Sequence, residues 1–208
     1  MRYRDYKESG PGEYFHIFNR GNEKNNIFLD KDDFSFFLLR LRQNLQPSEK
    51  EKRVCRNRFL PEGSFSLICY CLMPNHFHLL LRQNKDLRTG TLLSRVCTSY
   101  SSYFNKKYQR IGHLFQDKFK QVIIDNNEYL VWVSAYIHQN PKVAGIVKVP
   151  EDYKWSSYSG FIGTDNNPLC DSKVITEQFG DLNEYKKFVD SSHGIIKDKK
   201  DINDLLLD

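Results

Sequence analysis

The stretch Met73-Pro74-Asn75-His76-Phe77-His78-Leu79-Leu80-Leu81 places two histidines, two residues apart, at the start of an apolar run. In a β-strand the side chains alternate between the two faces of the sheet, so His76 and His78 would project from the same face. Their backbones would then be about 7 Å apart, which is close enough for both imidazoles to bind one ion. The alternative is a pair of solvated or hydrogen-bonded histidines that bind no ligand.

The segments around this stretch predict an α+β fold. Alternating and β-favouring residues predict strands over 14–19, 65–73, 76–82 and 119–124. Apolar residues at helical spacing predict helices over 30–45, with Asp30 as N-cap, over 87–108, and over 127–139, where Asn140-Pro141 would end the helix. The order β-α-β-β-α-β-α is that of a ferredoxin-like split βαβ fold, an antiparallel sheet with helices packed on one face.

Two further regions differ in composition from these elements. Residues 46–63 are polar, charged and bounded by prolines, which predicts a loop or a mobile insertion. Residues 164–208 contain 6 Lys against 10 Asp and Glu, whereas residues 1–163 contain 25 basic and 16 acidic side chains. We therefore expect one functional domain over 1–163 and an acidic, partly helical extension over 164–208.

Charge and composition restrict the partners and the compartment. The basic body and a 14% aromatic content favour a polyanion, with nucleic acid as the first candidate, although such a charge could serve solubility alone. No apolar run approaches the ~20 residues that span a bilayer, and no signal-peptide core follows Met1, so we expect a cytoplasmic protein with no membrane partner. Five cysteines without a CxxC pair indicate reduced thiols and lack the usual ligand spacing of a zinc site.

A third group of residues could complete a site around the histidine pair. Tyr136 and Asn140 are four residues apart in a predicted helix, hence on one face. If that face covers the sheet surface that carries His76 and His78, a phenol and an amide oxygen lie beside two imidazoles. Such a set of N and O ligands suits Mg²⁺ or Mn²⁺, which could orient and polarise a phosphate.

Tyrosine can act as a covalent nucleophile. Because its free pKa is near 10, it needs a proton acceptor or a nearby positive charge, and the sequence offers Lys118, Lys120 and His138 without choosing among them. Tyr129 lies seven residues before Tyr136, on nearly the same helix face, and is the main rival nucleophile.

Several motifs in chain order resemble those of the single-tyrosine HUH-type transposases, most closely the REP-associated branch. The resemblance covers about residues 12–162 and is carried by Tyr14-Phe15-His16-Ile17-Phe18-Asn19-Arg20-Gly21-Asn22, Met73-Pro74-Asn75-His76-Phe77-His78, Gly112-His113-Leu114-Phe115-Gln116, Tyr136-Ile137-x-x-Asn140-Pro141 and Trp155-Ser156-Ser157-Tyr158. It implies that 1–163 is an HUH-type catalytic domain, with a divalent metal at His76, His78 and Asn140 and with Tyr136 as nucleophile. It also implies cleavage of single-stranded DNA through a 5′-phosphotyrosine, with release of a 3′-OH that can reverse the reaction.

The expected substrate is single-stranded or hairpin DNA, bound by a monomer or a homodimer. Most contacts should go to phosphates. The candidate side chains are Arg20, Arg95, Lys106, Lys107, Arg110, Lys118 and Lys120, some of which could merely solvate helix faces. Two other functions stay open, namely a domesticated DNA-binding protein that no longer transposes, and a metal-dependent hydrolase in which water attacks.

Overall fold

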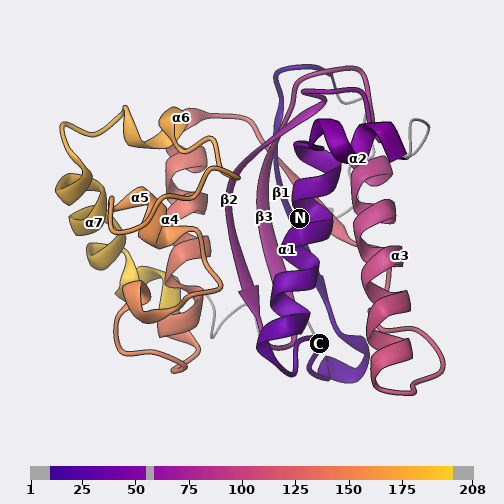
Figure 1. The fold of residues 1–208 in the computed structure, drawn as a ribbon. Helices are drawn as coiled ribbons and strands as arrows, with labels where there is room; N and C mark the ends of the chain where they lie inside the picture. Colours follow the sequence, from indigo (N-terminus) through magenta and orange to yellow (C-terminus); the bar gives the residue numbers. More distant parts are fainter. Residues whose placement is uncertain (1–9, 55–58, 199–208) are drawn as a thin grey trace.

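A four-stranded antiparallel sheet lies at the centre of the computed structural model, which describes residues 10–54 and 59–198 (Figure 1). Its strands are β1 (Tyr14–Arg20), β2 (Phe65–Met73), β3 (His76–Gln83) and β4 (Lys120–Ile124), in the order β2-β3-β1-β4. Every neighbouring pair is antiparallel, and β2 and β3 form a hairpin that turns at Pro74 and Asn75. This order confirms the predicted α+β class with split βαβ connectivity.

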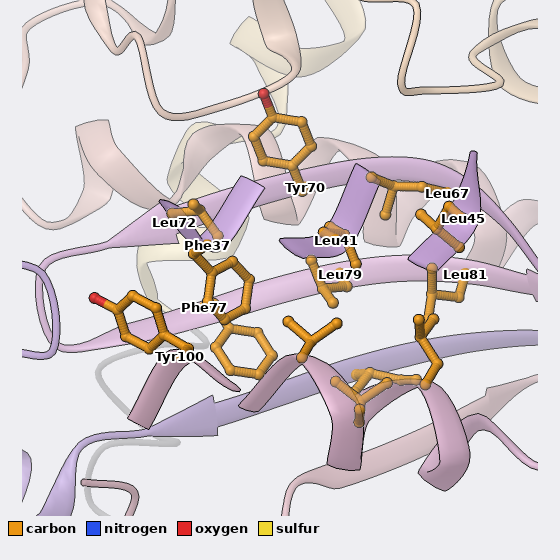
Figure 2. Packing of buried hydrophobic residues seen from close by; sticks show 14 of the residues in the cluster. Phe37, Leu41, Leu45, Leu67, Tyr70, Leu72, Phe77, Leu79, Leu81 and Tyr100 are labelled. Carbon is orange, nitrogen blue, oxygen red and sulfur yellow. The ribbon is translucent and has the colours of Figure 1, made fainter. Parts of the chain in front are cut away.

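Helices α1 (Lys31–Leu45) and α3 (Thr89–Lys107) cover one face of the sheet, which we call the α1/α3 face (Figure 1). Figure 2 shows side chains from β3, such as Phe77 and Leu79, packed against Phe37 of α1 and Tyr100 of α3, all fully buried. The predicted N-cap of α1 is confirmed, because the Asp30 carboxylate accepts from two backbone N–H groups within a capping box.

The opposite face of the sheet, the α4 face, is covered by α4 (Asn127–Val143), which packs against β2 and β3. The expectation that the helices pack on one face is therefore wrong for α4, although it holds for α1 and α3. The reason lies in the strands, which are apolar on both sides. Leu79 and Leu81 enter the core under α1 and α3, while Leu80 and Cys71 enter a second core with α4. Each apolar face must be removed from water.

Two local predictions are also corrected. Helix α4 continues past Pro141 to Val143, because proline removes one N–H donor but leaves the Asn140 carbonyl to accept from Ala144 N–H at 2.9 Å. Within the segment predicted as a loop, Glu49–Val54 forms the short helix α2. Ser48 and Glu51 exchange the reciprocal hydrogen bonds of a capping box there, a signal that the polar composition concealed. Residues 55–58 lie outside the described part.

Residues after 143 wrap around α4 and contribute to its core. They form η2 (Pro150–Asp152), α5 (Tyr158–Phe161), α6 (Lys173–Thr176) and α7 (Leu182–Ser191), and one further short turn, η1 (Asn22–Lys24), follows β1. Tyr185 and Val189 of α7 are fully buried in the same cluster as Val133 of α4. The predicted boundary at residue 163 stays a prediction. Within the described residues, none of the helices is both long and apolar enough to cross a bilayer.

Candidate metal and nucleophile site

The strand register places the two histidines on the α4 face. In the β1–β3 ladder His78 is paired with Phe18 and His76 with Arg20. On β1, Phe18 is in turn paired with Lys120 of β4. Because paired residues project to the same side, the row His78–Phe18–Lys120 runs across three strands beneath α4, with Arg20 beside it. The prediction that His76 and His78 share a face agrees with this register.

Each of the two histidines has its Nδ1 atom in a hydrogen bond. His76 Nδ1 lies 2.6 Å from the amide Oδ1 of Asn75, and His78 Nδ1 lies 3.0 Å from Nε2 of His16. The His76 and His78 ring centroids are 5.0 Å apart. His78 and His16 are both buried, and burial lowers the pKa of His16 to about 4, so that its imidazole is neutral at pH 7.

Helix α4 brings the predicted nucleophile and the predicted amide ligand to this face. The Tyr136 ring stands edge-on to His78 and His16, with centroids 5.6 and 5.8 Å away. One turn later, Asn140 is 1% exposed and its Nδ2 donates to the Tyr136 carbonyl at 2.9 Å. Its Oδ1 is buried and accepts no hydrogen bond from the described residues. A buried amide oxygen without a donor is unfavourable unless something else occupies its lone pairs, as a cation would.

Comparisons with known proteins identify the family. Residues 39–140, about half of the chain, match the family model described as "Transposase IS200 like". This chain is a member of the IS200-like transposase family. A Haemophilus influenzae protein named as a REP-associated tyrosine transposase is 30% identical over 105 residues, which are 45% of this chain and 59% of that relative. The chain thus spans about three fifths of that relative's length.

A solved structure shares the fold of this family member. It is the structure of a REP-associated tyrosine transposase bound to a REP hairpin, which superposes with a TM-score of 0.57 at 17% identity. The match covers 81% of this chain and 89% of that chain. At this level of identity the likeness supports the fold, including the sheet and its helices.

The structure assigns His138 of this IS200-like protein to a different environment from the one that the sequence suggested. Its Nδ1 is bonded to the Tyr185 hydroxyl at 2.7 Å and its Nε2 to Ser157 Oγ at 2.9 Å, and all three residues are fully buried. Burial lowers the pKa of His138 to about 3. Since both ring nitrogens already have partners that connect α4 to α7 and to the segment before α5, His138 is not the proton acceptor for Tyr136.

Sequence reasoning gave no role to His16, which contacts both His78 and Tyr136. Two features of the sequence indicate that His16 could lie on the same sheet face as the histidine pair. His16 alternates with Phe18 along a predicted strand, and a split βαβ sheet pairs its first strand with its third. Only the register, however, shows which side chain of β1 lies beside which histidine.

The seven predicted DNA-contacting residues divide between the two faces. Arg20 and Lys120 lie on the α4 face beside the histidine pair, and Lys118 is exposed just before β4. The others belong to α3 or to the turn after it, on the α1/α3 side; they are Arg95, Lys106, Lys107 and Arg110.

The assignment of Lys107 to DNA is not supported. Its ammonium lies 2.8 Å from carboxylate oxygens of both Asp30 and Asp33, and 3.1 Å from the Tyr103 hydroxyl. Although partial burial opposes its charge, the hydrogen bonds with Asp30 and Asp33 raise the pKa of Lys107. Lys107 therefore fixes the end of α3 to the start of α1. Arg110 lies over the Phe104 ring, 5.7 Å from its centroid.

The donor set of the site fits a hard or borderline divalent cation. Among the described residues, no group of three or more His, Cys, Asp or Glu side chains is placed so that it could hold a metal ion. Two imidazoles and the amide oxygen of Asn140 would form a neutral donor set, which suits an ion such as Mg²⁺ or Mn²⁺ that also binds water and phosphate oxygens.

Proposed function

We propose that this protein is a transposase that cleaves and rejoins single-stranded or hairpin DNA, with Tyr136 as the nucleophile. The observation that carries the proposal is the position of Tyr136, whose ring stands against His78. One turn further along α4, Asn140 has a buried amide oxygen that accepts no hydrogen bond from the described residues. Family membership and the hairpin-bound relative of the same fold support it. The rival tyrosine, Tyr129, lies two turns before Tyr136, and Trp132 stands between them.

The chemistry is a reversible exchange of phosphodiester oxygens. The Tyr136 phenolic oxygen attacks a backbone phosphorus, the phosphorus–O3′ bond breaks, and the O3′ atom takes up a proton. The product is a 5′-phosphotyrosine and a free 3′-OH. A 3′-OH of the same or another strand then attacks the phosphotyrosine, forms a new phosphodiester and returns the proton to the phenol. Because the phosphotyrosine conserves the bond energy, no nucleotide triphosphate is required.

A divalent ion, Mg²⁺ or Mn²⁺, is part of the proposal. His76, His78 and Asn140 would hold it, and when bound it would act as a Lewis acid toward the scissile phosphate. The chain's own residues supply the remaining features. Lys120 and Arg20 add positive charge on the same face of the sheet, where a phosphate backbone must enter. Positive charge near a phenol favours the phenolate, so Lys120 is also the candidate that activates Tyr136.

We further propose that the protein works in the cytoplasm, as a monomer or a homodimer. The four described cysteines are all free thiols, which fits a reducing compartment.

The test is a covalent-adduct assay. Labelled single-stranded hairpin DNA is incubated with the protein and Mn²⁺ or Mg²⁺, and the products are resolved under denaturing conditions. We expect a metal-dependent protein–DNA band that disappears in Tyr136→Phe and persists in Tyr129→Phe. Binding without any adduct would instead favour a domesticated DNA-binding protein. Cleavage that survives Tyr136→Phe would indicate attack by water.

A further inference from the structure

Both histidines of the candidate ion site are held through the same ring atom. Nδ1 of His76 is bonded to Asn75 Oδ1, and Nδ1 of His78 is bonded to His16 Nε2. The two partners come from different places in the chain, one from the residue before His76 and the other from β1, 62 residues before His78. In each ring the Nε2 atom is the nitrogen that points away from this bond.

The chemistry of a neutral imidazole gives these bonds a consequence. One ring nitrogen carries a hydrogen and the other a lone pair, and only the lone pair can bind a cation. An amide oxygen can only accept, so His76 must carry its hydrogen on Nδ1 and its lone pair on Nε2. For His78 to bind through Nε2, it must likewise donate from Nδ1, which makes His16 Nε2 the acceptor and places the His16 hydrogen on Nδ1.

The surroundings of His16 fix its orientation as well as its hydrogen bond. It is 8% exposed, and its ring stacks on His78 with centroids 5.1 Å apart at 26°. The edge contact with Tyr136 limits movement from the side of α4. A histidine in this position can hold the His78 ring in one rotamer and one tautomer. In the β1–β3 ladder His16 is paired with Leu80, two positions along β3 from His78 and on the same face of the sheet.

Asn75 is held by the backbone around it. Gly21 N–H donates to the Asn75 carbonyl at 2.8 Å, and the Asn75 side chain donates from Nδ2 to the Lys24 carbonyl at 3.2 Å. Gly21 also permits the tight turn after β1, because a Cβ at that position would lie 2.1 Å from the Asn25 carbonyl oxygen. The turn before β3 is thereby anchored to the end of β1, and the Asn75 amide is presented to His76.

We propose that His16 and Asn75 are positioning residues that orient His78 and His76, respectively, to bind a divalent ion through Nε2. The inference rests on the proposed ion site and deepens it. His16 lies outside residues 39–140, the part that matches the family model, so that match gives it no role. Partners of this kind typically change metal affinity by about 10- to 100-fold when they are removed.

The experiment is a calorimetric titration with Mn²⁺ alone, without DNA, on the full chain. His16→Phe keeps an aromatic ring at this position but removes the acceptor for the His78 Nδ1–H group. We expect this variant to bind Mn²⁺ about 10- to 100-fold more weakly than the unaltered protein. His16→Gln restores an acceptor and should recover most of the affinity. Asn75→Ala should show a smaller loss, about threefold, because His76 is half-buried and water can replace the amide oxygen.

Two controls separate this inference from the proposed function. His78→Ala removes a ligand and should abolish binding, whereas His113→Phe alters an exposed histidine outside the site and should not affect it. If His78→Ala abolishes binding while His16→Phe binds like the unaltered protein, the positioning role is wrong and the ion site stands. If the unaltered protein binds no Mn²⁺, both the positioning role and the proposed ion site are wrong. Thermal unfolding in EDTA checks that His16→Phe and His16→Gln are folded.

Discussion

On one face of the sheet, β1 and β3 present Phe15, Ile17 and Leu79 to α1 and α3, whereas on the other face the same strands present His16 and His78 to α4. The residues alternate along each strand, so a core and a site are built from neighbouring positions. A slip of one residue in the β1–β3 register would exchange the two sets. The apolar core therefore fixes the register that brings His16 to His78.

The two faces also differ in how their buried groups are satisfied. The α1/α3 face is filled by apolar and aromatic side chains whose packing is not directional. The α4 face buries three histidines in hydrogen bonds, His16 with His78 and His138 with Tyr185. It also buries the Asn140 amide oxygen, which accepts no hydrogen bond from the described residues. Both faces should contribute to stability through their apolar cores, whereas sensitivity to ions, protons and DNA should be concentrated on the α4 face.

The largest effect is expected from truncating the core. Phe77→Ala, on the α1/α3 face, should lower the free energy of unfolding by about 3–5 kcal/mol, because Phe77 is fully buried and a cavity would remain. Phe18→Ala is the same substitution on the α4 face, and since Phe18 is only half-buried its effect should be clearly smaller. Urea unfolding in EDTA measures both variants. Equal losses of unfolding free energy would mean that burial does not determine how much each of these two phenylalanines stabilises the fold.

The next effect concerns the ion. Mn²⁺ at about 100 times its dissociation constant should stabilise the unaltered protein by about 2.7 kcal/mol, since it binds the native state. Addition of EDTA should reverse this gain, and His78→Ala should not show it. The unfolding midpoint with and without Mn²⁺ provides the measurement. A gain that persists in His78→Ala would place the ion elsewhere.

Acid should destabilise the α4 face through its buried histidines. Burial lowers the pKa of His138 to about 3, so the folded state stays neutral there while the unfolded state gains a proton as the pH falls through about 6.5. The stability that His138 contributes is thus complete above about pH 6.5 and is lost toward pH 3. Between pH 6.5 and pH 5 the loss is about 2 kcal/mol for this histidine.

His138→Gln tests this assignment. The variant should be less stable at pH 7, because the bonds with Tyr185 and Ser157 are altered. Its unfolding free energy, measured in EDTA from pH 7 to pH 5, should nevertheless fall less steeply than that of the unaltered protein. Parallel pH profiles would mean that His138 does not account for the acid sensitivity.

The smallest effect is expected from single cations that contact DNA. Lys120→Gln should reduce the slope of the logarithm of DNA affinity against the logarithm of salt concentration by about 0.7, the loss of one phosphate contact to a single strand. Lys107→Gln is the control, because its charge is engaged by Asp30 and Asp33. It should lower stability and leave the slope unchanged. If the two variants change the slope equally, Lys107 also contacts DNA.

Local periodicity was enough to predict most of the fold. Alternation located β2 and β3 on either side of Pro74-Asn75, and helical spacing located α1 and α3 to within a few residues. The same rules placed His76 and His78 on one face and Tyr136 and Asn140 on one side of a helix. The inferences about which residues share a face agree with the structure because the backbone repeat sets that geometry. The predicted helix end at Pro141 and the predicted loop over 46–63 were wrong, although they too were drawn from neighbouring residues.

What could not be predicted depends on contacts between distant residues. The bonds from His16 to His78, from His138 to Tyr185 and from Lys107 to Asp33 join residues 62, 47 and 74 positions apart. Each requires the strand order or the docking of a helix before the partner can be named. For the same reason the sequence did not show that α4 would form a separate layer, although the apolar residues on both sides of β3 required a cover on each face.

If Tyr136 forms the covalent bond to DNA, identifying the modified residue will show it. The adduct formed with single-stranded hairpin DNA is digested with protease and nuclease, and the nucleotide-bearing peptide is sequenced by mass spectrometry. We predict a nucleotide 5′-phosphate on Tyr136. A nucleotide on Tyr129 or on any other residue, or DNA cleaved without any linked peptide, would contradict the account.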